Sequence, residues 1–325
     1  MNLTDTRRFA GIRFGLSIST APDMPGGGDP DQFINSLTFR IASSLLLEGG
    51  SLVLGHRWSS EGIMEHLTFQ ARDSRGCGWR ESSGADAKPP PSIQNIIAWP
   101  DTPPSGDKNA DRMIRDGILE IRQVLPPAIP LDQLDPDRAK ALATDLGKFA
   151  RIRALTAMRQ EIVRLTDARI CLGGEIGKPT RRLPGLIEEA LLTCQAGKPV
   201  YISSALGGAA KAMADAILHR RMSDDARAMF FTPPAIVKLF GDMADNKYPA
   251  VGNEGPSVAD GWNAFALFQS LPLATLSQQA GLSEEEYVLL LTSADVQRIL
   301  GLAMTGILRL RTTAAPGNQA AQARG

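Results

Sequence analysis

Short apolar runs alternate with amphipathic segments along the first two thirds of the chain. Residues 9–19 (FAGIRFGLSIS) predict a strand, and residues 33–50 repeat apolar side chains at helical spacing before a glycine stop. The same strand–helix pair recurs at residues 51–58 and 61–73, with short connections between the elements. This alternation predicts a parallel sheet.

Later segments continue the alternation. Residues 93–99 predict a third strand, and a helix is predicted over 113–124 and a long helical region over 135–165. The runs ARICLGG and KPVYISS then predict a fourth and a fifth strand, with helices at 183–197 and 207–221. The expected fold class is therefore α/β, a Rossmann-like parallel sheet with helices on both faces and a helical C-terminal extension.

The alternation ends near residue 222, which suggests three parts. Residues 9–221 are expected to form the sheet domain, 222–311 a helical extension and 312–325 a disordered tail.

Residues 273–291 have helix-turn-helix spacing, but the three glutamates at 284–286 would repel phosphates, so we expect a packing or dimerisation segment. Residues 73–92 are polar and rich in Gly and Pro, and they predict a mobile loop over or beside a cleft.

Composition excludes several classes of function. The 35 basic residues equal the 35 acidic ones, so no overall field favours nucleic acid or an anionic membrane. Three cysteines and three histidines without ligand spacing argue against a disulfide framework and a metal centre, and no bound cofactor is expected. The chain starts without the apolar core of a signal peptide and has no apolar run of about 18 residues, so we expect a cytoplasmic protein.

Small, polar and basic residues follow the predicted strands. In a parallel sheet the ligand lies beyond the carboxyl ends of the strands, where glycines allow close approach and helix N-termini offer N–H groups to an anion. We expect Ser17, Gly55, Gly174 and Gly207 to border one cleft at a single edge of the sheet. The candidate ligand-binding residues are Ser17, Ser19, Gly55, His56, Arg57, Gly173, Gly174, Gly185, Glu188, Gly207 and Gly208.

A pair of carboxylates, Glu188 and Glu189, stands in the first turn of an amphipathic helix. The helix dipole alone favours acidic residues there, so simple capping is one interpretation. The other is that a carboxylate enters the cleft, where it would hold ribose hydroxyls or stabilise positive charge at an anomeric carbon. Arg159, on the preceding helix, could pair with that carboxylate or hold a phosphate, and we expect the Arg159 and Glu189 side chains to approach each other.

The stretch AMRQEIVRLTDARICLGGEIGKPTRRLPGLIEEALLTCQAGKPVYI resembles the lonely-guy nucleotide phosphoribohydrolases, in which an arginine-bearing helix leads through a strand to a PGGxGTxxE loop. The N-terminal part, with Ser17, Ser19 and an SIS-x-x-PD-like segment, resembles a branch of the wider SLOG (SMF/DprA–LOG) superfamily. The resemblance covers about residues 9–221. It matches Arg159 to the motif arginine, Gly185 to the second loop glycine and Glu189 to the final glutamate. About ten residues are inserted in the loop, Leu186 replaces the threonine and Gln160 replaces a basic residue.

The resemblance implies a module that binds a nucleotide or a nucleotide-derived signal, acting as a sensor in a bacterial antiviral defence system. The alternative is an N-glycosidic hydrolase or transferase on nucleotides or NAD, with Glu189 and Arg159 as catalytic residues. A third interpretation is a structural protein with a vestigial pocket. The partner hypotheses are a nucleotide-derived small molecule, a homodimer and an effector protein, without direct DNA binding or a membrane.

Overall fold

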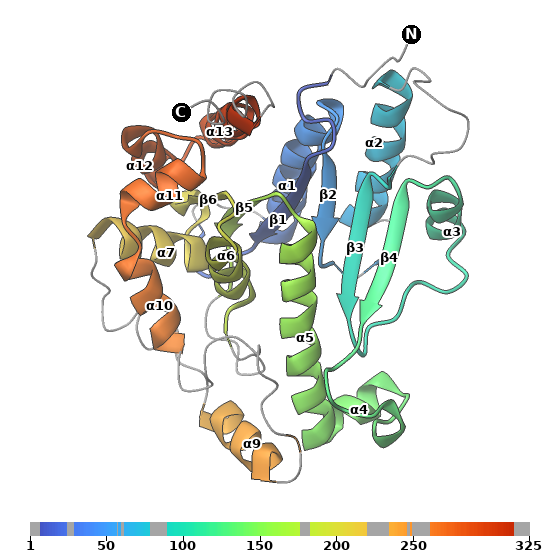
Figure 1. Cartoon of the computed structure of the whole chain (residues 1–325). Coiled ribbons are helices and arrows are strands. Elements are labelled where there is room, and N and C mark those ends of the chain that lie inside the picture. Colours follow the sequence, from blue (N-terminus) through green and yellow to red (C-terminus); the bar gives the residue numbers. More distant parts are fainter. Residues whose placement is uncertain are drawn as a thin grey trace, which may run out of the picture.

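The computed structural model describes residues 7–24, 29–56, 58–59, 62–78, 90–175, 183–219, 234–245, 248 and 261–314 of the 325-residue chain. They form a central parallel sheet with helices packed around it (Figure 1). The predicted α/β, Rossmann-like class is confirmed.

The sheet has six parallel strands in the order β4-β3-β2-β1-β5-β6. The chain first adds strands on one side of β1 and then crosses over to add β5 and β6 on the other side. The position between β1 and β5 is therefore a topological switch point. The strands are β1 Arg13–Ser19, β2 Ser51–Leu54, β3 Ile93–Ala98, β4 Leu119–Val124, β5 Ala168–Gly173 and β6 Val200–Ser203.

The edge strand β4 was not predicted, and the helix predicted over residues 113–124 is wrong. A short helix, α3 (Lys108–Arg115), ends before Gly117, which has φ +69°, and the chain then pairs with β3. The segment LEIRQV mixes apolar and charged residues because β4 lies at the sheet edge and only Leu119 is fully buried. Its composition therefore lacks the apolar run that marks a central strand.

Helices cover both faces of the sheet. Along β2, Val53 packs with residues of α5, whereas Leu52 and Leu54 belong to the core under α1 and α2. The predicted helical region 135–165 is divided at Thr144, whose hydroxyl accepts a hydrogen bond from Gly147 and caps α5. The helices up to β6 and directly after it are α1 Pro30–Leu47, α2 Ile63–Gly78, α3 Lys108–Arg115, α4 Arg138–Ala143, α5 Asp145–Leu165, α6 Gly185–Gln195 and α7 Gly208–His219.

The C-terminal helices cover the outer edge of β6. The Tyr287 hydroxyl donates to the Val200 carbonyl at 2.8 Å, and the Ser203 hydroxyl donates to the Ser293 carbonyl at 2.9 Å. Phe268 and Leu290 belong to the same hydrophobic core as the strands. The described helices after α7 are α9 Pro234–Asp245, which packs on α5 and not on β6, and α10 Gly261–Ser270, α11 Leu273–Gln279, α12 Glu284–Thr292 and α13 Val296–Ala314.

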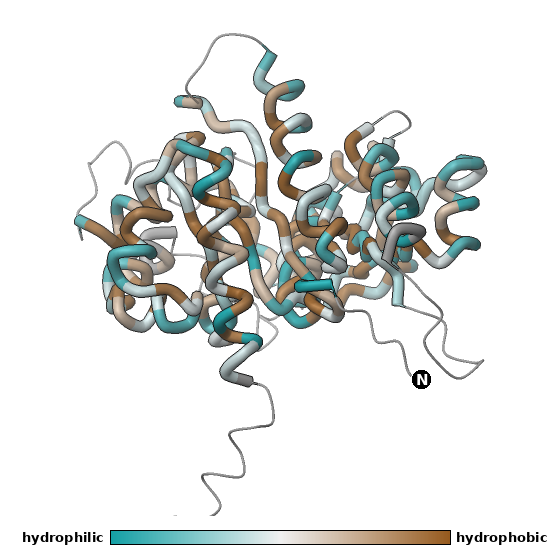
Figure 2. Tube along the Cα trace, turned by 90° about the horizontal axis from the view of Figure 1, so that it is seen from above, coloured by the Kyte–Doolittle hydropathy of each residue, from teal (hydrophilic) through white to brown (hydrophobic). Residues whose placement is uncertain are grey.

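The segment with helix-turn-helix spacing forms α11 and α12, and α12 packs on β6 (Figure 1). The predicted disordered tail begins too early, because α13 continues through residues 312–314. The predicted boundary between residues 221 and 222 lies outside the described residues. Among the described helices, whose hydropathy Figure 2 shows from above, none is long and apolar enough to cross a membrane.

Candidate functional site

The predicted site residues gather at the carboxyl edge of the sheet. Ser17 pairs in register with Cys171, and Ser19 pairs with Gly173, so the ends of β1 and β5 lie side by side at the switch point. Ser17, Gly55, Gly174 and Gly207 lie at one edge of the sheet, as expected, because each lies at the carboxyl end of a parallel strand or in the connection that follows it, whereas the single cleft that they should border stays a prediction. Arg57 lies outside the described residues.

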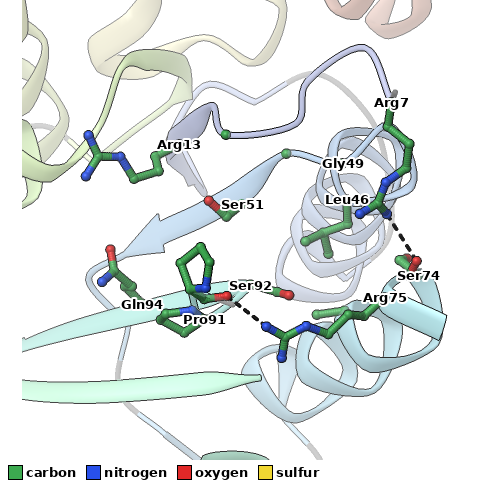
Figure 3. Close-up of a pocket in the computed structure, with 14 residues that line it drawn as sticks. Arg7, Arg13, Leu46, Gly49, Ser51, Ser74, Arg75, Pro91, Ser92 and Gln94 are labelled. Carbon is green, nitrogen blue, oxygen red and sulfur yellow. Dashed lines mark hydrogen bonds between the residues drawn. The ribbon is translucent and has the colours of Figure 1, made fainter. Parts of the chain in front are cut away.

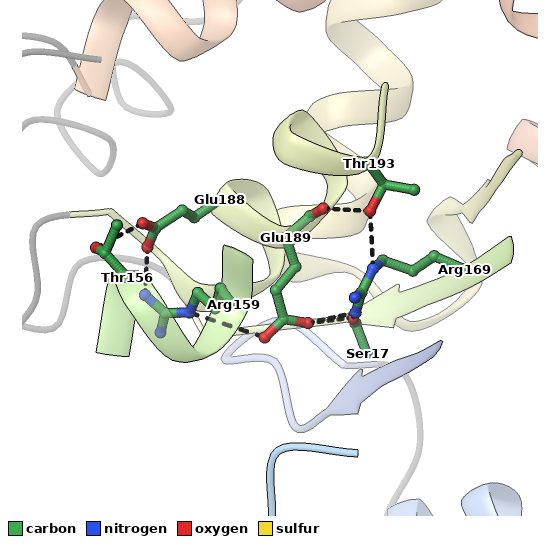
Figure 4. A network of polar contacts seen from close by, with 7 residues as sticks. All are labelled: Ser17, Thr156, Arg159, Arg169, Glu188, Glu189 and Thr193. Atoms are coloured by element: carbon green, nitrogen blue, oxygen red, sulfur yellow. Dashed lines mark hydrogen bonds and ion pairs between the residues drawn. The ribbon is translucent and has the colours of Figure 1, made fainter. Parts of the chain in front are cut away.

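Glu189 lies at the centre of a polar network between α6 and the strands (Figure 4). Its Oε2 accepts hydrogen bonds from the Ser17 hydroxyl and from Nη1 of Arg169, the latter at 2.8 Å. Arg169 also donates from Nη1 to the Ser17 hydroxyl at 2.7 Å and from Nε to the Thr193 hydroxyl at 2.9 Å. The Glu189 side chain keeps 16% of its surface exposed, so part of it remains accessible to a ligand.

Glu188 points inward and pairs with the predicted arginine. It accepts hydrogen bonds from Nη1 of Arg159 and from the Thr156 hydroxyl, the latter at 2.7 Å. Nε of Arg159 lies 3.8 Å from Oε1 of Glu189, so Arg159 and Glu189 approach each other as predicted. The closer partner of Arg159 is nevertheless Glu188, and both side chains of this pair are about 95% buried. Simple capping of the helix N-terminus therefore does not account for the contacts of Glu188 or of Glu189.

Arg169 was missed by the sequence-based prediction. It is 1% exposed within the buried strand β5, and its guanidinium lies over Gly15 of the neighbouring strand. A Cβ at Gly15 would lie 3.0 Å from Cζ of Arg169, so the glycine makes room for the cation. The available signal was an arginine inside the apolar run ARICLGG, since charged side chains are rarely buried without a partner.

The N-terminus of α7 is already occupied by protein groups. The N–H of Gly208 donates to the Asp23 carboxylate at 2.7 Å, and the N–H of Ala209 donates to the Gly174 carbonyl at 3.0 Å. Gly207 donates to the carbonyl of Ser204. The N–H groups of Gly207, Gly208 and Ala209 thus all have protein acceptors, and the role of Gly207 and Gly208 in ligand binding stays a prediction. Asp23 lies 185 residues away in sequence and acts as the helix cap.

The N-terminus of α6 is different. Its N-cap is Pro184, which makes no side-chain cap hydrogen bond. A Cβ at Gly185, the first residue of the helix, would lie 2.8 Å from Nη2 of Arg159, so the guanidinium packs directly on the helix start. A buried cation and the partial positive charge of a helix N-terminus thus coincide beside Glu188 and Glu189.

His56 lies in the turn after β2, and Asn95 holds that turn in place. The backbone N–H of His56 donates to Oδ1 of Asn95 at 3.0 Å, and Nδ2 of Asn95 donates to the His56 carbonyl at 2.7 Å. His56 is exposed, yet desolvation by the protein atoms around it lowers the pKa of its imidazole, and the Glu189 carboxylate partly opposes this shift. His56 therefore lies within electrostatic range of Glu189 at the carboxyl edge of the sheet. Asn95, which is fully buried, was not predicted.

Cys171 lies in the strand beside Ser17 and is fully buried. Burial raises the pKa of its thiol to about 12, and Cys194 is raised to about 12 by the same cause. A thiol with so high a pKa is a poor nucleophile near neutral pH, which agrees with the prediction that Cys171 is a small core residue.

A basic cavity of about 330 Å³ lies at the opposite, amino edge of the sheet (Figure 3). Arg7, Arg13 and Arg75 line it, and no predicted site residue does. Arg75 donates to the Gly117 and Pro90 carbonyls there. The prediction that residues 73–92 form a loop beside the ligand cleft is therefore wrong for its described parts. Residues 73–78 end α2, and 90–92 line this amino-edge cavity, because a helix-to-strand connection returns to the amino edge. Residues 79–89 lie outside the described chain.

Comparison with known proteins agrees with this geometry. The family model described as SLOG cluster2 matches residues 8–288, which includes the whole sheet, the Arg159–Glu189 region and the helices up to α12. No curated protein sequence matches the chain. Because the family model spans most of the chain, the protein belongs to the SLOG cluster2 family, and this membership implies binding or modification of a nucleotide-related ligand.

Proposed function

We propose that the protein is a binding module for a phosphate-bearing, nucleotide-derived signal, held at the carboxyl edge between β1 and β5. The observation that carries the proposal is the contact between the Arg159 guanidinium and the N-terminus of α6 at Gly185. Nη2 of Arg159 makes no hydrogen bond within the described residues, so it can donate to an anion placed at that helix end. Backbone N–H groups of the first turn would complete the site.

The arrangement of Glu189 supports binding over hydrolysis. Its Oε2 already accepts from Ser17 and Arg169, and its Oε1 faces Arg159 at 3.8 Å. Two cations beside one carboxylate offset the negative charge that would stabilise an oxocarbenium-like transition state. The same contacts position the exposed part of Glu189 to accept hydrogen bonds from sugar hydroxyls.

The second candidate function is N-glycosidic cleavage of a nucleotide. The observation in its favour is that Glu189 and Arg159, matched to the motif residues of the lonely-guy hydrolases, lie together at the switch point. In such an enzyme, Glu189→Gln would abolish most release of free base and leave nucleotide binding intact, because only the transition state requires the charge. Incubation of the parent with nucleoside monophosphates and NAD, followed by chromatography, should give no free base if the module only binds.

Nucleotide binding should depend on the charge of Arg159. In the double variant Arg159→Gln with Glu188→Gln, no buried charge is left unpaired, and affinity for a nucleoside monophosphate should fall roughly 10- to 100-fold through loss of a charge-assisted hydrogen bond. Affinity for the matching nucleoside should stay the same. Isothermal calorimetry of both ligands measures the difference.

The matched control for this experiment is Glu188→Gln alone, which keeps the Arg159 cation and removes only its buried partner. It should bind the nucleotide at least as tightly as the parent once folding is verified by circular dichroism. Equal affinity of the double variant and the parent for every monophosphate would show that Arg159 does not contact the phosphate.

A further inference from the structure

A second cavity, of about 670 Å³, is lined by residues of α4, α5 and α9. Figure 1 shows α9 beside the N-terminal end of α5, on the side of the sheet where the strands end. Ile152 and Leu155 of α5 face Ile236 and Leu239 of α9 across it. Its volume lies in the range of small-molecule sites, and six apolar residues share its lining with three basic and two acidic ones. It is not lined by any of the predicted site residues.

This cavity begins next to the proposed phosphate position. Leu155 and Arg159 are four residues apart on one side of α5, so they lie about 6 Å apart along the helix axis, and Ile152 lies about 10 Å from Arg159. Arg151 connects the two places. It lines the cavity, donates to the Trp99 carbonyl at 2.8 Å beyond the end of β3, and lies within electrostatic range of Arg159.

We propose that the α5–α9 cavity holds the heteroaromatic base of the same ligand whose phosphate lies at Arg159 and the N-terminus of α6. This inference rests on the proposed function and adds the recognition of the base. A planar base fits between the aliphatic side chains of the two helices, and its polar edge meets the charged groups that line the cavity, among them Lys148 and Lys238. Selection of the base is therefore assigned in part to α9, a helix that follows the last strand of the sheet in the sequence.

Filling the cavity should remove the contribution of the base and leave that of the phosphate. Ala235 is exposed and lines the cavity, so Ala235→Trp blocks it without deleting a core side chain. The probes are ribose 5-phosphate and the four mononucleotides AMP, GMP, CMP and UMP, measured by calorimetry on the full chain. At least one mononucleotide should bind the parent about tenfold tighter than ribose 5-phosphate, the factor expected for burying about 60 Å² of apolar surface. Ala235→Trp should abolish this advantage and leave ribose 5-phosphate binding unchanged.

The matched control is Val237→Trp, which adds the same side chain to α9 at an exposed position that does not line the cavity. It should keep the preference for the mononucleotide. A photoreactive azido derivative of that mononucleotide provides a second measurement that needs no variant, because it should label peptides of α5 or α9 that line the cavity.

The outcomes separate the two proposals. If ribose 5-phosphate and the mononucleotides bind equally, or if Ala235→Trp keeps the preference and labelling falls outside α5 and α9, the base is bound elsewhere and the inference is overturned. The phosphate site then still stands on its dependence on Arg159. If none of the five probes binds, the proposed function itself fails.

Discussion

Replacing Arg169 with methionine should lower the free energy of unfolding by about 3–5 kcal/mol, the cost of leaving one member of a buried ion pair without its partner. Arg169 is 1% exposed and donates to Glu189, Ser17 and Thr193 at once. Methionine fills much of the same volume, so the loss reports mainly the missing cation and its hydrogen bonds. Urea denaturation followed by circular dichroism measures the change.

Two controls identify the cause of that loss. The double variant Arg169→Met with Glu189→Gln carries no unpaired carboxylate at this position and should recover a substantial part of the stability. Arg13→Met breaks a pair with Asp167 in which both side chains are more than 40% exposed, and it should cost at most about 1 kcal/mol. Similar losses for Arg169→Met and Arg13→Met would contradict the view that the Arg169 network supports the site.

Gly208→Ala should destabilise the fold by about 2–5 kcal/mol. Gly208 has φ +59°, a conformation that costs an L-residue about 1–2 kcal/mol. Its added Cβ would also lie 2.2 Å from the Gly174 carbonyl oxygen, so two turns at the carboxyl edge would have to separate, an overpacking cost of about 1–3 kcal/mol. Thermal unfolding monitored by calorimetry measures the loss.

Gly197→Ala is the control for the backbone cost alone. Gly197 has φ +67°, but an added Cβ would meet nothing within 4 Å. It should therefore lose only about 1–2 kcal/mol. If both alanine variants lose the same amount, the close contact between Gly208 and Gly174 contributes nothing to stability.

Most of the fold could be predicted because the central strands and their helices have distinct hydrophobic periods. Strands β1, β2, β3, β5 and β6 all lie within predicted segments, and α5 and α6 lie within predicted helical regions. Strand β4 could not be recognised, because it lies at the edge of the sheet with only Leu119 buried, and its sequence LEIRQV also fits a helix. The local hydrophobic pattern was thus sufficient to predict the central, well-buried strands and the helices next to them.

The candidate site was predicted only in part, for a related reason. The edge that carries the site follows from strand order, and Arg159 and Glu189 follow from a resemblance within one continuous stretch. The residues that contact this site from other parts of the chain could not be predicted in this way. Asp23 caps α7 from 185 residues away, and Ser17 meets Arg169 from 152 residues away. Such contacts depend on register between strands, which no local spacing contains.

The contact between Tyr287 and Val200 has a consequence for synthesis of the chain. Tyr287 follows Val200 by 87 residues. At about 5–20 residues per second, a ribosome needs roughly 4–17 s to add the helix that covers β6 after the strand itself has emerged. During these seconds the nascent sheet has an open edge, and open edges pair readily with other strands. Slower translation of residues 200–287 should therefore increase aggregation of the nascent chain, and chaperones that bind exposed strands should reduce it.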